Sequence, residues 1–227
     1  MIGIIGGTSF LETDVARKGK HERIVTPWGG VDVVLSDTFA MIARHGAEGY
    51  TPPHRINDHA HIRAMEMLNV EGIVSFASVG SLKPEIPIGT LVVADDIYAP
   101  FKTVTYRNNR LKFHLPTFDH AWRESVLETL RGADLNPRDG GVYAETLGPR
   151  LESVAEIRHL ADYADVVGMT AASEFVLASE LGIPLAILAV VDNMAHGLGV
   201  KPLSGEAFWE QVKNNQSKSL KALNALI

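Results

Sequence analysis

One apolar run constrains the fold of this chain more than any other segment. Residues 184–191 read PLAILAVV and contain no polar side chain. A strand of this composition must be covered on both faces, which places it in the interior of a sheet with helices on either side. Residues 72–79 (GIVSFASV) form a second, mostly apolar run that contains two serines, and residues 2–5 (IGII) form a shorter one. The sequence therefore predicts a sheet whose central strands are buried on both faces.

Segments with helical spacing separate these strands. Apolar residues recur at helical intervals at 56–68, 119–130, 153–160, 173–181 and from 206 towards 226. Further strands are predicted at residues 31–35, 39–43, 91–94 and 164–169. Strands that alternate with helices indicate an α/β protein. We expect a single domain over residues 1–227, with a mixed central β-sheet flanked by helices.

The composition narrows the class of partner. The chain has 227 residues, a formal net charge of -6 and no cysteine. It has no basic tract, so nucleic acid is not an expected partner, because binding to phosphate backbones needs clustered Lys and Arg. No window reaches about 18 uninterrupted apolar residues, so no membrane span or membrane partner is expected either.

Two further expectations concern location and metals. The first residues lack the basic flank and the length of a signal peptide, which favours a cytoplasmic protein. The nine histidines show no H-E-x-x-H or similar spacing, so no metal site is expected.

Polar side chains stand where several predicted strands end. These residues are Thr8, Arg44 with His45, Ala77 with Ser78, Met169 with Thr170, and Asn193. Ligands of open α/β sheets collect beyond the carboxyl ends of the strands. We therefore expect these groups to converge on one ligand site.

Each group taken alone also has an ordinary structural explanation. Gly6-Gly7-Thr8 can cradle an anion with backbone N–H groups, or it can be a tight turn only. Arg44-His45 can bind a phosphate or carboxylate, or it can be a surface arginine beside a packed histidine.

The same holds for two acidic or amide positions. Glu152 precedes a predicted helix and is either a ligand acceptor or an acid favoured by the helix dipole. Asp192-Asn193 closes the apolar strand and is either a turn or a ligand contact, since a desolvated amide must be paired.

Taken in order, the motifs resemble one family. The segments that carry the resemblance are IGIIGGTSF, RHGAEGYTPPHRIN, SVGSLKPEIPIGTLVVADD, LGPRLESVAEI, VVGMT and EFVLASELGIPLAILAVV. They resemble the trimeric purine nucleoside phosphorylases, in particular the branch of methylthioadenosine and methylthioinosine phosphorylases. The resemblance implies the fold of that family, a distorted, barrel-like sheet of the phosphorylase/hydrolase type.

The resemblance also implies an activity, that of a pentosyltransferase in purine salvage. The reaction would be the reversible phosphorolysis of a purine nucleoside to free purine and ribose 1-phosphate. Inorganic phosphate would be the co-substrate, with no cofactor and no metal. The resemblance further implies a homotrimer, or a dimer of trimers, with active sites near the subunit interfaces.

Carried over by position, the resemblance assigns roles to individual residues. Phosphate would contact Thr8, Arg44, His45, Ala77, Ser78 and Thr170. The nucleoside would contact Leu151, Glu152, Met169, Asn193, Met194 and Ala195. Arg44, His45 and Asn193 would act in catalysis. Phosphate held under the sugar would stabilise and attack an oxocarbenium-like carbon, and a hydrogen bond at N7 would relieve the charge on the departing purine.

Two positions favour 6-oxopurine nucleosides such as inosine, guanosine and 5′-methylthioinosine. Methylthioadenosine phosphorylases resemble this segment, but they have Asp at the position of Asn193. A carboxamide can donate a hydrogen bond to O6 of the purine while it accepts one from a protonated N7. Glu152 can accept the N1–H of a 6-oxopurine, whereas N1 of adenine is itself an acceptor. If Asp192 faced the base instead, the chain would be a 5′-methylthioadenosine phosphorylase. A non-catalytic nucleoside-binding protein on the same scaffold is the third alternative.

The start of the last helix bears on the sugar. Gly205 stands where inosine-cleaving relatives have a His for the 5′-hydroxyl and methylthio-specific relatives have an apolar residue. A glycine leaves room and offers no side-chain hydrogen bond. A 5′-methylthio or 5′-deoxy group should therefore be tolerated, and inosine stays a candidate.

Overall fold

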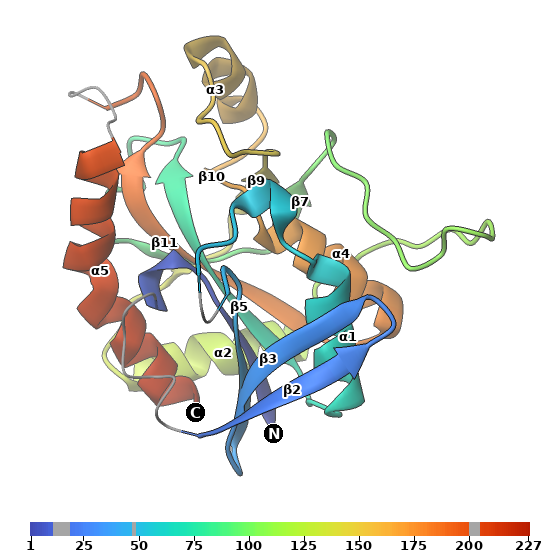
Figure 1. The fold of residues 1–227 in the computed structure, drawn as a ribbon. Helices are drawn as coiled ribbons and strands as arrows, with labels where there is room; N and C mark the ends of the chain where they lie inside the picture. Colours follow the sequence, from blue (N-terminus) through green and yellow to red (C-terminus); the bar gives the residue numbers. More distant parts are fainter. Residues whose placement is uncertain (11–18, 47–48, 200–204) are drawn as a thin grey trace.

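A computed structural model describes residues 1–10, 19–46, 49–199 and 205–227. Within these residues, helices cover both faces of one large sheet (Figure 1). The strands are β1 (Ile2–Gly6), β2 (Lys20–Thr26), β3 (Gly29–Leu35), β4 (Phe39–Ala43), β5 (Ile73–Ser81), β6 (Leu91–Val93), β7 (Asp96–Tyr98), β8 (Arg138–Asp139), β9 (Val142–Glu145), β10 (Val166–Gly168) and β11 (Leu185–Met194). The α-helices are α1 (Asp58–Met67), α2 (His120–Gly132), α3 (Val154–Ala161), α4 (Ala171–Leu181) and α5 (Gly205–Leu226).

The sheet is organised around β5. This strand pairs in parallel with β1 and with β11, and its last residues pair antiparallel with β10. β1 in turn lies parallel to β4. Strands β2 and β3 extend the sheet beyond β4, β9 and β7 extend it beyond β10, and β6 and β8 lie beyond β11. Because β1, β4, β5 and β11 run in one direction, their carboxyl ends meet at the same edge of the sheet.

β11 shows why the apolar run had to be central. Its side chains alternate between the two faces of the sheet, and both faces are covered. Ile187 and Ala189 belong to the hydrophobic cluster that includes α1 and α4, whereas Ala186 and Leu188 belong to the cluster that includes α2 and α5. A third, smaller cluster joins α3 to β9 and β10. The predicted α/β domain with a mixed central sheet is confirmed.

The predicted helices agree with the structure to within two residues at either end. α1 begins at Asp58, two residues later than predicted, because the Asn57 side chain accepts a hydrogen bond from the Ala60 N–H at 3.1 Å and caps the helix. α4 begins at Ala171, two residues earlier than the prediction. The strand predicted at residues 39–43 is β4.

Several strands were not predicted from the sequence. β2 is an edge strand of mostly polar residues, and β7, β8 and β9 contain two to four residues each, too few to show a hydrophobic period. Residues 99–118 contain no helix or strand and form a segment that projects from the body of the molecule (Figure 1, green). No helix in the described part of the chain is long and apolar enough to span a membrane.

Candidate active site

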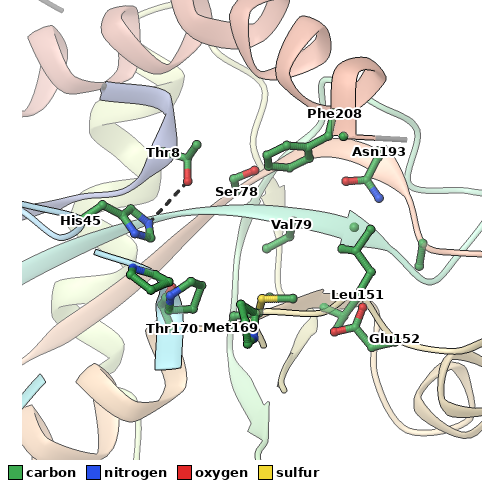
Figure 2. Close-up of a pocket in the computed structure, with 18 of the residues that line it drawn as sticks. Thr8, His45, Ser78, Val79, Leu151, Glu152, Met169, Thr170, Asn193 and Phe208 are labelled. Atoms are coloured by element: carbon green, nitrogen blue, oxygen red, sulfur yellow. Dashed lines mark hydrogen bonds between the residues drawn. The ribbon is translucent and has the colours of Figure 1, made fainter. Parts of the chain in front are cut away.

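The strand ends at this edge of the sheet surround a pocket of about 310 Å³. Its walls contain most of the residues selected from the sequence: Thr8, Arg44, His45, Ser78, Leu151, Glu152, Met169, Thr170, Asn193, Ala195 and Gly205. Figure 2 shows Thr8, His45 and Thr170 towards one end of the pocket and Leu151, Glu152 and Asn193 towards the other. The fold therefore brings most of the residues selected from the sequence together around one pocket.

Two predicted contacts lie outside the pocket wall. Ala77 and Met194 are not among the described residues that line it. The Ala77 side chain is buried in the hydrophobic cluster with α1 and α4, because neighbouring residues of a strand point to opposite faces. The same alternation turns Met194 away while its neighbour Asn193 faces the cavity; the Met194 carbonyl accepts a hydrogen bond from the Asn193 Nδ2 at 2.8 Å.

Arg44 reaches the pocket with most of its donors already used. Nε and Nη2 donate to the two carboxylate oxygens of Glu174 at 2.5 and 2.9 Å, Nη2 also donates to the Ser75 hydroxyl at 2.8 Å, and Nη1 donates to the Phe76 carbonyl at 2.7 Å. A guanidinium has five N–H groups. One N–H on Nη1 is therefore left for a ligand, so Arg44 offers an anion a single donor and not the two-pronged fork.

Gly7 is required by this placement of Arg44. A β-carbon built on Gly7 would lie 2.6 Å from Arg44 Nη1 and 2.7 Å from the Phe76 carbonyl oxygen. Any side chain at this position would displace the guanidinium. The Gly6-Gly7-Thr8 segment is thus a close backbone approach to a charged group as well as a turn.

The charge of Arg44 is balanced inside the protein. Arg44 and Glu174 have almost no exposed side-chain surface. Burial alone would lower the pKa of Arg44, but the Glu174 carboxylate raises it above its ordinary value. Burial would raise the pKa of Glu174, yet Arg44 and the Ser75 hydroxyl hold it below its ordinary value. Both groups are therefore charged, and the pair contributes no net charge to the pocket.

His45 is neutral in the folded protein. Burial, and then the neighbouring Arg44, lower the pKa of His45 to about 4. Its Nδ1 lies 2.8 Å from the Thr51 carbonyl, which can only accept, so Nδ1 carries the proton. Nε2 is then a bare acceptor, 3.5 Å from the Thr8 hydroxyl. This histidine therefore offers a ligand no positive charge at neutral pH, and its Nε2 can accept a hydrogen bond.

A β-bulge decides which residue of the Asp192-Asn193 pair faces the pocket. β11 pairs with β5 through Val191 opposite Val79 and then Asn193 opposite Gly80, so Asp192 is the extra residue. Asn193 lines the pocket, whereas the Asp192 side chain is fully buried.

Asp192 has partners of its own behind the wall. It accepts hydrogen bonds from the Ser78 hydroxyl and, at 2.8 Å, from Asn215 of α5. Burial raises the pKa of Asp192, and these two hydrogen bonds oppose the shift. The Ser78 hydroxyl therefore donates its hydrogen bond to Asp192, and towards a ligand it can act only as an acceptor.

Glu152 is not the cap of the helix that follows it. Ser153 occupies that position and forms a capping box with Glu156, which is also the acid of the first turn. Glu152 instead accepts a hydrogen bond from the Thr146 hydroxyl and is mostly buried in the pocket wall. The ligand-acceptor alternative is the one that this geometry favours.

Some lining residues were missed from the sequence. Tyr50 stacks on the His45 ring, with centroids 4.7 Å apart and planes 7° apart, and lies edge-on to Trp209 at 6.3 Å. Phe208, one helical turn after Gly205, also lines the pocket. The i, i+3 spacing on α5 is a signal that could have identified Phe208 once Gly205 was selected. No comparable signal marks Tyr50.

Comparison with known proteins identifies the family. The model of a family described as the phosphorylase superfamily matches residues 1–227. The chain belongs to the phosphorylase superfamily. This confirms the family resemblance stated from the sequence motifs.

Individual relatives are similar to this chain over more than nine tenths of their length. The chain is 38% identical to a protein of Archaeoglobus fulgidus named "Probable 6-oxopurine nucleoside phosphorylase", over 100% of this chain and 96% of the relative. It is 33% identical to a protein of Methanocaldococcus jannaschii named "Probable S-methyl-5'-thioinosine phosphorylase", over 100% of this chain and 92% of the relative.

Solved phosphorylases share the fold. Methylthioadenosine phosphorylase from Schistosoma mansoni in complex with adenine superposes with a TM-score of 0.85 and 22% identity, covering 99% of this chain and 90% of that one. At this identity the likeness establishes the architecture alone.

The buried pair beneath the pocket yields a stability prediction. The substitution Glu174→Gln should lower the free energy of unfolding by about 3–5 kcal/mol, because it leaves the Arg44 charge buried without its partner. The matched control is Glu66→Gln, which breaks the half-exposed Arg63–Glu66 pair and should cost less than about 1 kcal/mol. Urea unfolding at fixed protein concentration measures both, and equal small losses would contradict the argument.

Proposed function

We propose that this protein is a purine nucleoside phosphorylase that acts on 6-oxopurine nucleosides: inosine, guanosine or 5′-methylthioinosine. The products are the free purine and ribose 1-phosphate or 5-methylthioribose 1-phosphate. The observation that carries the proposal is the presence of Asn193, and not Asp192, in the pocket wall. The names of the relatives at 38% and 33% identity support it.

The base end of the pocket suits a 6-oxopurine. The Asn193 carboxamide can donate to O6 and accept from a protonated N7. Glu152 can accept the N1–H that a 6-oxopurine carries and adenine lacks. Leu151, 46% exposed and beside Glu152 in the wall, offers apolar surface to the ring.

The other end suits phosphate. Thr8 and Thr170 present hydroxyl groups from two strand ends, and Arg44 has one N–H to spare. His45 Nε2 can accept a hydrogen bond from the O–H of a singly protonated phosphate. Most of the donors belong to groups fixed by internal hydrogen bonds, so they need little reorganisation when charge develops.

The proposed reaction places these ends on either side of the sugar. The bond between C1′ and N9 breaks, its electron pair stays on the purine, and the purine takes up a proton from solvent at N7, where the Asn193 carboxamide oxygen accepts a hydrogen bond from the new N–H. A phosphate oxygen then forms the new bond to C1′ from the opposite face. Met169 lies between the two ends in Figure 2, in position to contact the ribose. Phosphate is the only co-substrate, and the proposal includes no cofactor or metal.

The finer features of assembly and location are also proposals. We propose that the protein assembles as a homotrimer or a dimer of trimers. We also propose that it acts in the cytoplasm, in purine salvage. Three apolar side chains of the projecting segment support an interface, with Leu111, Phe113 and Leu115 exposed by 84%, 89% and 80%. A hollow of about 480 Å³ shares Glu152 with the pocket and is lined by Phe101 from the same segment.

The proposal is tested by a substrate panel with and without phosphate. We expect phosphate-dependent cleavage of the 6-oxopurine nucleosides inosine, guanosine and 5′-methylthioinosine. The 6-aminopurine nucleosides adenosine and 5′-methylthioadenosine should be cleaved poorly. Release of purine should require phosphate. Cleavage of the adenine nucleosides alone would favour a methylthioadenosine phosphorylase, and nucleoside binding without turnover would favour a non-catalytic protein.

Exchange of acid and amide at the bulge tests the base contact. Asn193→Asp should lower kcat/KM for inosine by about tenfold or more, because a carboxylate cannot donate to O6, and should shift the preference towards adenine nucleosides. The matched variant Asp192→Asn changes the neighbouring residue behind the pocket wall. It should leave the ratio of kcat/KM for inosine to kcat/KM for adenosine unchanged. An unchanged ratio in Asn193→Asp would show that this side chain does not read the base.

The start of α5 tests the 5′ end of the sugar. A β-carbon built on Gly205 meets no atom within 4 Å, so a larger side chain fits there. Gly205→His should raise kcat/KM for inosine relative to methylthioinosine, because the imidazole supplies a hydrogen bond for the 5′-hydroxyl and fills the space of the methylthio group. Gly132→His on α2, also in open space, is the control. Equal ratios in both variants would place the 5′ group elsewhere.

A further inference from the structure

We propose that Thr146 is a positioning residue that holds the Glu152 carboxylate in one orientation, and thereby sets the preference for bases with an N1–H over bases with a bare N1. The inference deepens the proposed function and rests on it, because it concerns the same base end of the pocket. Thr146 is not among the described residues that line this pocket; it lines the neighbouring hollow of about 480 Å³.

Glu152 stands between two cavities. It lies in the wall of the pocket and in the wall of the hollow, and it is only 8% exposed. A glutamate side chain has several rotatable bonds, so a carboxylate in such a wall can be turned towards either cavity. Asn193, the other side chain proposed to read the base, lies towards the same end of the pocket (Figure 2). The orientation of Glu152 therefore decides whether the base end offers an acceptor beside this amide.

The Thr146 hydroxyl fixes that orientation. It donates a hydrogen bond to Oε1 of Glu152, since an ionised carboxylate can only accept. Hydrogen bonds to a charged group are about twice as strong as those between neutral groups. Because Thr146 lines the hollow, its hydroxyl reaches the carboxylate from the side away from the base. The second oxygen, Oε2, is then left for a ligand in the pocket.

Thr146 is itself held by the sheet. It directly follows β9, and its N–H donates to the Gly168 carbonyl at the end of β10, at 2.9 Å. This bond continues the parallel pairing of the two strands, in which Glu145 lies opposite Gly168. The hydroxyl oxygen lies 3.5 Å from the same carbonyl, too far to compete with the shorter bond to the carboxylate. The donor for Glu152 therefore comes from a fixed backbone.

The main chain of Glu152 is held on both sides. His196 Nδ1 lies 2.8 Å from the Glu152 carbonyl, which can only accept, so Nδ1 carries a proton and donates it to this bond. On the other side, the Ser153 N–H donates to the Glu156 carboxylate at 2.7 Å, within the capping box of α3. Rotation of the Glu152 side chain is the freedom that remains. The Thr146 hydroxyl restricts it.

The consequence is a preference between two classes of base. A carboxylate held towards the pocket can accept the N1–H of a 6-oxopurine without first being ordered, and it repels the lone pair on N1 of adenine. Without the hydroxyl, the Glu152 carboxylate can turn into the hollow. The contact to the 6-oxopurine and the repulsion of adenine would then weaken together. Thr146 therefore acts on the ratio between the two classes of nucleoside.

The test is the ratio of kcat/KM for inosine to kcat/KM for adenosine. Thr146→Val replaces the hydroxyl by a methyl group and should lower this ratio by about tenfold, the effect of losing one hydrogen bond to a charged group. Thr146→Ser keeps the hydroxyl and should restore most of the ratio. Thr146→Ala gives the same readout if Thr146→Val does not fold. An unchanged ratio in the variants that lack the hydroxyl overturns the inference.

A second threonine provides the matched control. The Thr105 hydroxyl donates to the Glu180 carboxylate at 2.7 Å, and neither residue is among those described in the pocket wall. Thr105→Val removes this bond and should leave the ratio unchanged. KM for phosphate should change less than twofold in Thr105→Val and in Thr146→Val, because both contacts lie away from Thr8 and His45. An equal fall of the ratio in both variants would mean a general structural effect, and would overturn the inference.

A double variant shows whether Thr146 acts through Glu152. Glu152→Ala removes the carboxylate and should itself lower the ratio. Thr146→Val added to Glu152→Ala should then have no further effect, because both substitutions remove the same contact. Multiplication of the two effects overturns the inference alone. A wild type that cleaves no nucleoside in the panel, or only adenine nucleosides, overturns the proposed function and with it the role of Thr146.

Discussion

The structure depends on β5, the strand to which three neighbours are hydrogen-bonded. β1 and β11 lie on its two edges in parallel, and β10 joins its last residues in the opposite direction. The carboxyl end of β11 lies beside that of β5, β1 pairs with residues 73–75 and ends partway along β5, and the antiparallel partner β10 leads directly into α4. The pocket is therefore a property of the strand order. The side chains that line it come from segments far apart in the sequence, and no single loop could bring them together.

The ionisable groups beneath the pocket are paired or hydrogen-bonded before any ligand arrives. Arg44 is held by Glu174, and Asp192 is held by Ser78 and Asn215. Buried ions are costly unless they are paired and hydrogen-bonded, so these contacts are a condition for having polar groups at the sheet edge at all. They also fix the orientation of the groups that remain. Phosphate would meet an array of hydroxyl and N–H donors whose positions were set by folding, and little excess positive charge.

The sequence predicted the parts of this arrangement that have a period or a motif. The apolar run of β11 predicted a central strand, and polar residues at strand ends predicted the pocket, including Thr8, Thr170 and Asn193. The hydrogen bonds of Tyr143 to the backbone N–H groups of Thr170 and Ala171 could not be predicted, because β9 is too short to show a pattern and the contact depends on a glycine in another strand. The direction of the Ala77 side chain could not be predicted for a similar reason: a motif gives position along a strand, but not the face to which each side chain points.

Because of the bulge at Asp192, the side chain that faces this pocket depends on the pairing register of β11 as well as on the residue type at each position. Acid and amide are neighbours on β11, and the single unpaired residue determines which of them enters the cavity. Loss or gain of one residue along this strand would exchange the two without any substitution at either position. Related proteins that differ in the chemistry of their ligands could thus differ by the placement of one irregularity in a strand, and alignments that ignore backbone pairing would not detect it.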